Sequence, residues 1–150
     1  MAYLPRSASV PSAVTSLPSW TMARLSRIGR GWLQERLAAD GLRLAHYATL
    51  ETLAASGARA QRELAKSTGY DPSDMVAVLD HLQSLGLVER ERDELDRRRQ
   101  VTRLTAAGQA TVTRCRAAAA EAAQRLLAPL GDDAPAFQRM LAVLLEAHDR

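Results

Sequence analysis

The sequence has little of several things that mark particular classes of protein. Cys115 is the only cysteine, so no disulfide can form within the chain, which is typical of a reducing compartment. Aromatic residues make up only 4%, so the core must consist of Leu, Ala and Val, which favours helices over sheets. No stretch approaches the roughly 20 apolar residues of a membrane helix. We therefore expect a soluble, cytoplasmic protein with no membrane partner.

Patterns that carry enzymatic or metal chemistry are also missing. The sequence has no Gly-rich phosphate loop, no HExxH motif and no convincing Ser/His/Asp arrangement, and its three histidines lack metal-ligand spacing. We therefore expect no enzymatic activity, no catalytic residues, no cofactor and no metal site. Arginine is abundant, since 20 residues are Lys or Arg and only Lys66 is a lysine. A GC-rich genome would explain that bias as well as phosphate binding would, and the net charge of +3 is weak support for a polyanion partner.

Hydrophobic periodicity predicts six helices and two short strands in one domain spanning residues 18–150, preceded by a mobile tail at 1–17. The predicted helices lie near residues 18–39, 43–55, 61–68, 72–85, 106–127 and 132–147, and the strands near 87–92 and 100–104. Arg59 and Ala60 lie where they can pair with one of these strands. Residues 18–40 and 106–150 have more apolar surface than a small module needs. This surplus predicts a dimerisation bundle.

Residues 42–105 have the order helix, helix, turn, helix, strand, charged tip, strand. Asp71 is a good N-cap with Pro72 at the first helical position, and Thr105 looks like the cap of the long helix after the strands. Met75, Val78, Leu79 and Leu82 should face inward, leaving the other face free to lie in a DNA major groove. The expected fold is therefore mainly α with a small β-wing, a winged helix-turn-helix.

Four segments together resemble the MarR (multiple antibiotic resistance regulator) family in order and spacing. They are Gln61-Arg62-Glu63-Leu64-Ala65, the run from Leu82 to Arg90 through Leu85-Gly86-Leu87-Val88, Asp96-Arg97-Arg98, and Leu104-Thr105-x-x-Gly108. The resemblance covers residues 42–112 well and the outer helices only in length and placement. It implies a homodimeric transcriptional regulator, usually a repressor, that binds a pseudo-palindromic operator in double-stranded DNA and is often released by a small ligand or by thiol oxidation.

The resemblance also implies which residues contact DNA. Arg98 would enter the minor groove with Asp96 orienting it, while Arg90, Arg97 and Arg99 are candidates for phosphate or partner contacts. A simply solvated hairpin tip is the alternative. On the recognition helix the candidates are Ser73, Asp74, Val76, Ala77 and His81. Relatives often have Thr, Thr and Arg at positions 74, 76 and 77, so the helix departs from the family here.

This departure leaves an alternative function open. Asp74 can accept from a cytosine amino group, and Val76 and Ala77 can meet thymine methyls, but no arginine on the helix can bind guanine. The chain is then either a regulator that relies on wing and shape readout or a winged-helix interaction or effector-binding module that has lost DNA reading.

Two further sets of residues have both a functional and a structural interpretation. Cys115 lies between Arg114 and Arg116 and is either a sensor thiol or a small core residue. An effector pocket between the bundle and the DNA-binding lobe would use aromatic and basic side chains. The candidate wall residues, for which plain packing is the alternative, are Trp20, Trp32, Arg43, His46 and Tyr47.

Overall fold

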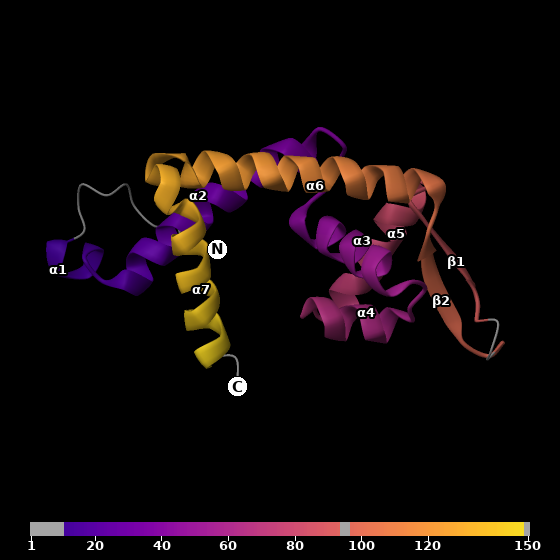
Figure 1. The fold of residues 1–150 in the computed structure, drawn as a ribbon. Coiled ribbons are helices and arrows are strands. Elements are labelled where there is room, and N and C mark those ends of the chain that lie inside the picture. The colour runs from indigo at the N-terminus through magenta and orange to yellow at the C-terminus, as the bar shows by residue number, and fades with distance from the viewer. Residues whose placement is uncertain (1–10, 94–96, 149–150) are drawn as a thin grey trace. The chain divides into compact units, whose positions relative to one another are not determined.

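A computed structural model describes residues 11–93 and 97–148 of the chain (Figure 1). The helices are α1 (Ser12–Thr15), α2 (Pro18–Ala38), α3 (Leu44–Ser56), α4 (Gln61–Thr68), α5 (Pro72–Ser84), α6 (Ala106–Leu127) and α7 (Ala134–His148), with a 3-10 helix η2 (Ala128–Asp133) before α7. The strands are β1 (Val88–Arg92) and β2 (Gln100–Leu104). The predicted mainly α fold with a small wing is confirmed. Within the segment that is expected to be a mobile tail, Ser12–Thr15 form a single helical turn after Pro11.

The chain divides into two compact units, Met1–Trp32 with Glu121–Arg150, and Leu33–Ala120. Helices α2 and α6 each run from one unit into the other. In the described parts of the chain, no helix is long and apolar enough to cross a membrane.

The larger unit is built around a core of aliphatic side chains, as the shortage of aromatic residues predicts. Fully buried positions come from six elements of this unit, α2, α3, α4, α5, β1 and α6, which share one core. These residues are Leu37, Leu42, Leu50, Leu64, Met75, Leu79, Leu82, Val88, Val112 and Cys115. Met75, Val78, Leu79 and Leu82 are all buried, so the predicted inward face of α5 is confirmed.

The wing is an antiparallel hairpin in which Val88 pairs with Leu104 and Arg92 with Gln100. Arg59 forms a β-bridge to Thr102, with N–H···O distances of 3.0 and 2.8 Å. The expectation that Arg59 can pair with a wing strand is therefore confirmed. This bridge attaches the wing to the chain before α4. The attachment stabilises the wing, because an isolated hairpin is only marginally stable in water.

A tight joint connects α5, the wing and α6. Gly86 ends α5 with a φ of 68°. Thr105 then caps α6: its Oγ1 accepts from the N–H of Gly108 at 3.0 Å and donates to the carbonyl of Gly86 at 2.7 Å. The backbone of Thr105 also donates to Leu87 O at 3.1 Å. A Cβ at Gly108 would lie 2.0 Å from Leu87 O, so the Leu-Thr-x-x-Gly pattern is a packing requirement.

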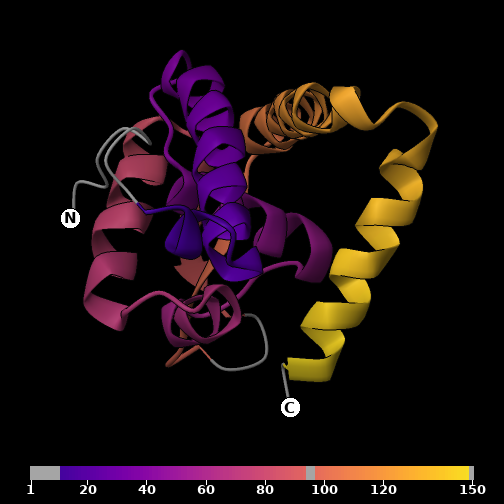
Figure 2. The same ribbon diagram turned by 90° about the vertical axis from the view of Figure 1, so that its left-hand side faces the viewer.

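The smaller unit contains helices that contact each other closely at one point. Leu126 of α6 packs against Gly29 of α2, where an added Cβ would lie 3.1 Å away. The Arg125 guanidinium lies 4.1 Å from the centre of the Trp32 ring. Helix α7, yellow in Figure 2, follows η2, in which Gly131 has a φ of 51°. None of the side chains of α7 is buried within the chain.

Candidate nucleic-acid interface

Helix α5 begins with a cap that its sequence predicts. The Asp71 carboxylate accepts hydrogen bonds from the N–H of Ser73 at 2.8 Å and from its hydroxyl, and Pro72 supplies a first residue that needs no N–H partner. Because the apolar face is buried, the opposite face is exposed to solvent. The exposed residues are Ser73, Asp74, Val76, Ala77 and Asp80. Val76 is 41% exposed and places an apolar side chain on this face.

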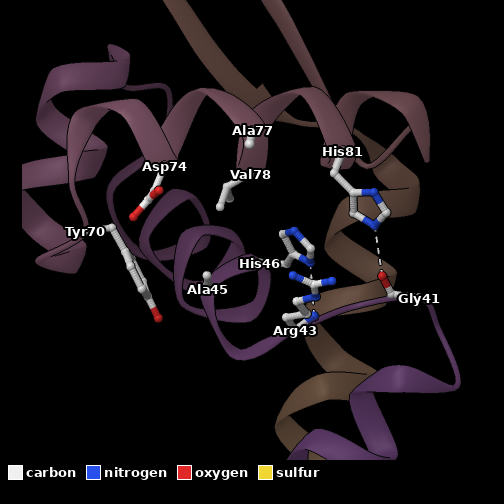
Figure 3. A pocket seen from close by; sticks show the side chains of 9 residues that line it. All are labelled: Gly41, Arg43, Ala45, His46, Tyr70, Asp74, Ala77, Val78 and His81. Atoms are coloured by element: carbon white, nitrogen blue, oxygen red, sulfur yellow. Dashed lines mark hydrogen bonds between the residues drawn. The ribbon is translucent and has the colours of Figure 1, made fainter. Parts of the chain in front are cut away.

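His81 lies differently from the other predicted contacts of this helix. Its ring stacks on that of His46, with centroids 4.5 Å apart and an interplanar angle of 21°. Its Nε2 is 2.8 Å from Gly41 O, so an Nε2–H donates to that carbonyl (Figure 3). His81 thus connects α5 to the start of α3. The DNA contact predicted for His81 stays a prediction, and its ring would have to leave these partners to make it.

A hollow of about 450 Å³ separates the start of α3 from the side of α5 (Figure 3). It is lined by Gly41, Arg43, Ala45, His46, Tyr70, Asp74, Ala77, Val78 and His81. Burial, followed by the proximity of His81 and Arg43, lowers the pKa of His46 to about 4. His46 is therefore neutral at pH 7, and its Nδ1 accepts from the N–H of Arg43 at 3.0 Å. The charged and polar side chains of the hollow are the Arg43 guanidinium, the Asp74 carboxylate, the Tyr70 phenol and the imidazoles of His46 and His81.

Only two of the five predicted effector residues, Arg43 and His46, line this hollow. Tyr47 lies beside Glu51, and burial together with its hydrogen bond to that carboxylate raises its pKa to about 12. Arg116 of α6 holds the same carboxylate through two hydrogen bonds of 2.8 and 2.9 Å. Tyr47 is therefore part of an α3–α6 contact. Trp20 and Trp32 belong to the other unit, where both are half-buried.

The wing presents two exposed arginines, Arg97 and Arg98, after its tip. Asp96, the predicted orienting residue, lies outside the described residues. Arg90 and Arg99 pair with carboxylates of the two helices of the helix-turn-helix. Arg90 Nη2 is 2.6 Å from Asp80 Oδ1 of α5, and Arg99 Nη2 is 2.5 Å from Glu63 Oε2 of α4.

Local sequence patterns do not identify these carboxylate partners. Asp80 and Glu63 are 10 and 36 residues from their arginines, so no local periodicity connects them. The one available signal was at Glu63, which stands three residues after Ala60 and accepts its N–H at 3.0 Å, as in a capping box. That pattern predicts a cap but not an ion pair.

Chemistry other than binding finds little support in the side chains. Among residues 11–93 and 97–148, no group of three or more His, Cys, Asp or Glu side chains is placed to hold a metal ion. Cys115 is only 2% exposed, and burial raises the pKa of its thiol. The interpretation of Cys115 as a small core residue is therefore confirmed, and burial makes its thiolate scarce.

The chain is similar in sequence and fold to transcriptional regulators of known structure. A model of the MarR family matches residues 40–99. The repressor CouR bound to a 23-mer DNA duplex is 29% identical over 91% of this chain and 99% of its own, with a TM-score of 0.78. CouR from Rhodococcus jostii RHA1 bound to p-coumaroyl-CoA is 25% identical over 91% of this chain and 95% of its own, with a TM-score of 0.77. A MarR family protein of Mycobacterium tuberculosis in complex with DNA is 28% identical over 86% of this chain and 98% of its own, with a TM-score of 0.75.

Proposed function

The chain belongs to the MarR family of winged-helix transcriptional regulators, which bind DNA and are not enzymes. We propose that it is a homodimeric repressor and that a small molecule releases it from its operator. Helix α5 lies in the major groove and the wing reaches the minor groove. One observation carries the proposal: the same unit presents the exposed face of the capped helix α5 and two exposed arginines, Arg97 and Arg98, on the wing.

Base reading by α5 depends on small and apolar side chains. Val76 and Ala77 are exposed and suit the methyl groups of thymine, while Ser73 and Asp74 can hydrogen-bond base edges or phosphates. Neither Lys nor Arg occurs between Pro72 and Ser84. Affinity must then come largely from the wing, where Arg98 is proposed to enter the narrow, electronegative minor groove with Asp96 orienting it and Arg97 beside it.

The test of this arrangement is salt-dependent binding to a duplex from the chain's own upstream region, followed by fluorescence anisotropy. Arg98→Ala should weaken binding strongly. Arg103→Ala is the matched control, because Arg103 lies within strand β2 of the same hairpin and faces Glu89 at 2.7 Å and Glu91 at 3.3 Å. The control should change the affinity little. Equal affinities for wild type and Arg98→Ala would refute the role of the wing tip.

A second copy of the chain is the partner that the apolar surface of α7 fits best. Met140, Val143, Leu144 and Leu145 are each at least 50% exposed, and a shallow hollow of about 380 Å³ lies along the same helix. A surface of this kind is typical of a partner interface. A two-fold dimer would also present two α5 helices to a pseudo-palindromic operator, with half-sites about one helical turn apart.

Paired substitutions separate dimerisation from DNA contact. Val143→Asp places a charge on the apolar surface of α7, and Val76→Asp makes the same change on the exposed face of α5. Light scattering should find Val143→Asp monomeric and Val76→Asp dimeric. Val76→Asp should therefore bind DNA poorly although it remains a dimer. A Val143→Asp variant that remains a dimer at low micromolar concentration would contradict the proposed interface.

The hollow beside α5 is the proposed effector site, because a ligand there would touch the recognition helix directly. Arg43 offers a cation, and His46 and Tyr70 offer flat apolar surfaces with polar edges. A ligand that separates His81 from His46 or Gly41 would shift α5 and weaken DNA binding. In support, CouR has been crystallised both with DNA and with p-coumaroyl-CoA. In the Arg43→Ala variant, the ligand should no longer release the protein from DNA, while the affinity for DNA without ligand should be unchanged.

The alternative function, a winged-helix interaction or effector-binding module without DNA reading, is favoured by one observation. The exposed face of α5 carries the carboxylate of Asp74, which repels phosphate, and no cationic side chain. A sequence-specific footprint would reject this alternative. The absence of any salt-dependent binding to duplex DNA would support it.

A further inference from the structure

Two ion pairs connect the wing to the two helices of the helix-turn-helix. Arg90 of β1 holds Asp80 of α5, and Arg99, which directly precedes β2, holds Glu63 of α4. Arg90 stands opposite Thr102 in the hairpin register, whereas Arg99 lies beyond the last pair, Arg92 with Gln100. The two contacts therefore hold the hairpin at two levels along its length, one to each helix.

The Arg90–Asp80 pair joins a partly buried guanidinium to an exposed carboxylate. The Arg90 side chain is only 22% exposed, so its interaction with a carboxylate at 2.6 Å is screened less than that of an open surface pair. Its partner Asp80 lies on the exposed side of α5, one residue before His81. The pair therefore connects β1 directly to the helix that is proposed to read bases.

In the Arg99–Glu63 pair the guanidinium is more exposed than that of Arg90, and both side chains have further partners. Glu63 also accepts the N–H of Ala60 at 3.0 Å, which fixes its carboxylate at the start of α4. The N–H of Asp93 donates to Arg99 O at 2.9 Å, and the Asp93 carboxylate lies 3.9 Å from Arg99 Nε. Hydrogen bonding to Ala60 and then to Arg99 lowers the pKa of Glu63, so the carboxylate is ionised at neutral pH.

We propose, resting on the DNA-binding function above, that Arg90 and Arg99 are positioning residues that act through Asp80 and Glu63 to set the angle between the wing and α5. Each pair carries no net charge, so neither contributes much of the counterion release that drives phosphate binding. Their effect on DNA is instead to hold Arg97 and Arg98 at the distance from α5 that lets both elements enter their grooves together.

This role and direct phosphate contact predict opposite results for the acidic partners. If Arg90 contacts a phosphate, Asp80→Asn frees it and removes a negative charge near DNA, so binding strengthens. If Arg90 positions the wing, Asp80→Asn weakens binding as Arg90→Gln does. We expect each change to weaken binding by about tenfold, the factor that corresponds to 1.4 kcal/mol. Glu63→Gln and Arg99→Gln form the second test pair, in which glutamine keeps the capping function at position 63.

Salt dependence gives an independent readout. Losing one phosphate contact reduces the slope of log K against log salt by about 0.9. Losing a positioning contact leaves the slope unchanged, because Arg97 and Arg98 still reach the DNA once the wing has been aligned, and only the cost of that alignment is added. Arg97→Gln is the reference for a true contact and should reduce the slope. Arg90→Gln and Arg99→Gln should lower the affinity at an unchanged slope.

The exchanged variant Asp80→Arg/Arg90→Asp restores an ion pair with the charges reversed, and we expect it to recover most of the affinity lost in each single variant. Urea unfolding of every variant establishes that binding is compared between folded proteins. The positioning role would be overturned if the Asp80→Asn variant bound DNA more tightly than wild type, or if the Arg90→Gln variant had a reduced salt slope. Either result would leave the proposed function intact. Wild-type protein that binds no duplex DNA would refute the proposed function itself.

Discussion

Gly108 offers a quantitative test of how the wing is joined to the long helix. It lies in the first turn of α6, where an alanine Cβ would be 2.0 Å from the backbone oxygen of Leu87. A backbone atom cannot rotate away as a flexible side chain can. Gly108→Ala therefore requires the start of α6 to move away from the chain that enters β1.

The expected cost combines three effects. Overpacking costs about 1–3 kcal/mol, and a displaced Thr105 N–H···O bond to Leu87 costs about 0.5–1.5 kcal/mol. The better helix propensity of alanine returns about 0.5–1 kcal/mol. We expect a net loss of about 2 kcal/mol, or roughly 4–8 °C in Tm for a chain of this size.

Urea unfolding at a fixed protein concentration measures this loss, since the stability of a dimer depends on concentration. Gly31→Ala in α2 is the matched control, because a Cβ there meets nothing within 4 Å. The control should stabilise the protein by up to about 1 kcal/mol. Should Gly108→Ala unfold within about 0.5 kcal/mol of wild type, the range of ordinary surface changes, the close contact with Leu87 would be refuted.

Three further predictions concern the same unit. Thr105→Ala should cost about 1 kcal/mol in urea unfolding because α6 loses its cap, and Thr105→Ser should recover most of it; equal losses would contradict the capping role. Because the pKa of His46 is lowered from 6.5 to about 4, the unfolded chain binds a proton between these values that the folded chain does not. The free energy of unfolding should therefore fall by up to about 1.4 kcal/mol per pH unit as the pH drops from 6.5 to 4, and His46→Gln should show a shallower fall. Cys115 should react with a thiol reagent only in urea, and peroxide should not release DNA; rapid labelling of the folded protein would restore the sensor hypothesis.

Much of the fold could be predicted because its signals are local. Gln61–Thr68 and Ala106–Leu127 have the predicted bounds, since Gly69 and Thr105 end and cap these helices through contacts within a few residues. The inward face of α5 followed from helical spacing alone. A single turn such as Ser12–Thr15 has no periodicity to detect, so it was missed.

The partners of the candidate site residues could not be predicted in the same way. Spacing places Asp80 and His81 away from the main core, but it does not say that Asp80 meets Arg90 or that His81 stacks on His46. Those contacts depend on how α5 packs against β1 and α3. For the same reason, spacing does not predict that Tyr47 lies beside Glu51, the carboxylate that Arg116 of α6 also binds.

A footprint of the full-length protein on genomic DNA tests the central proposal most directly. Two α5 helices and two wings in a two-fold dimer should protect two half-sites about one helical turn apart, with sequence related by a pseudo-dyad. Arg98→Ala should lose this protection at a salt concentration where wild type retains it. Uniform, sequence-independent protection, or none at any salt concentration, would contradict the assignment of this chain as an operator-specific regulator.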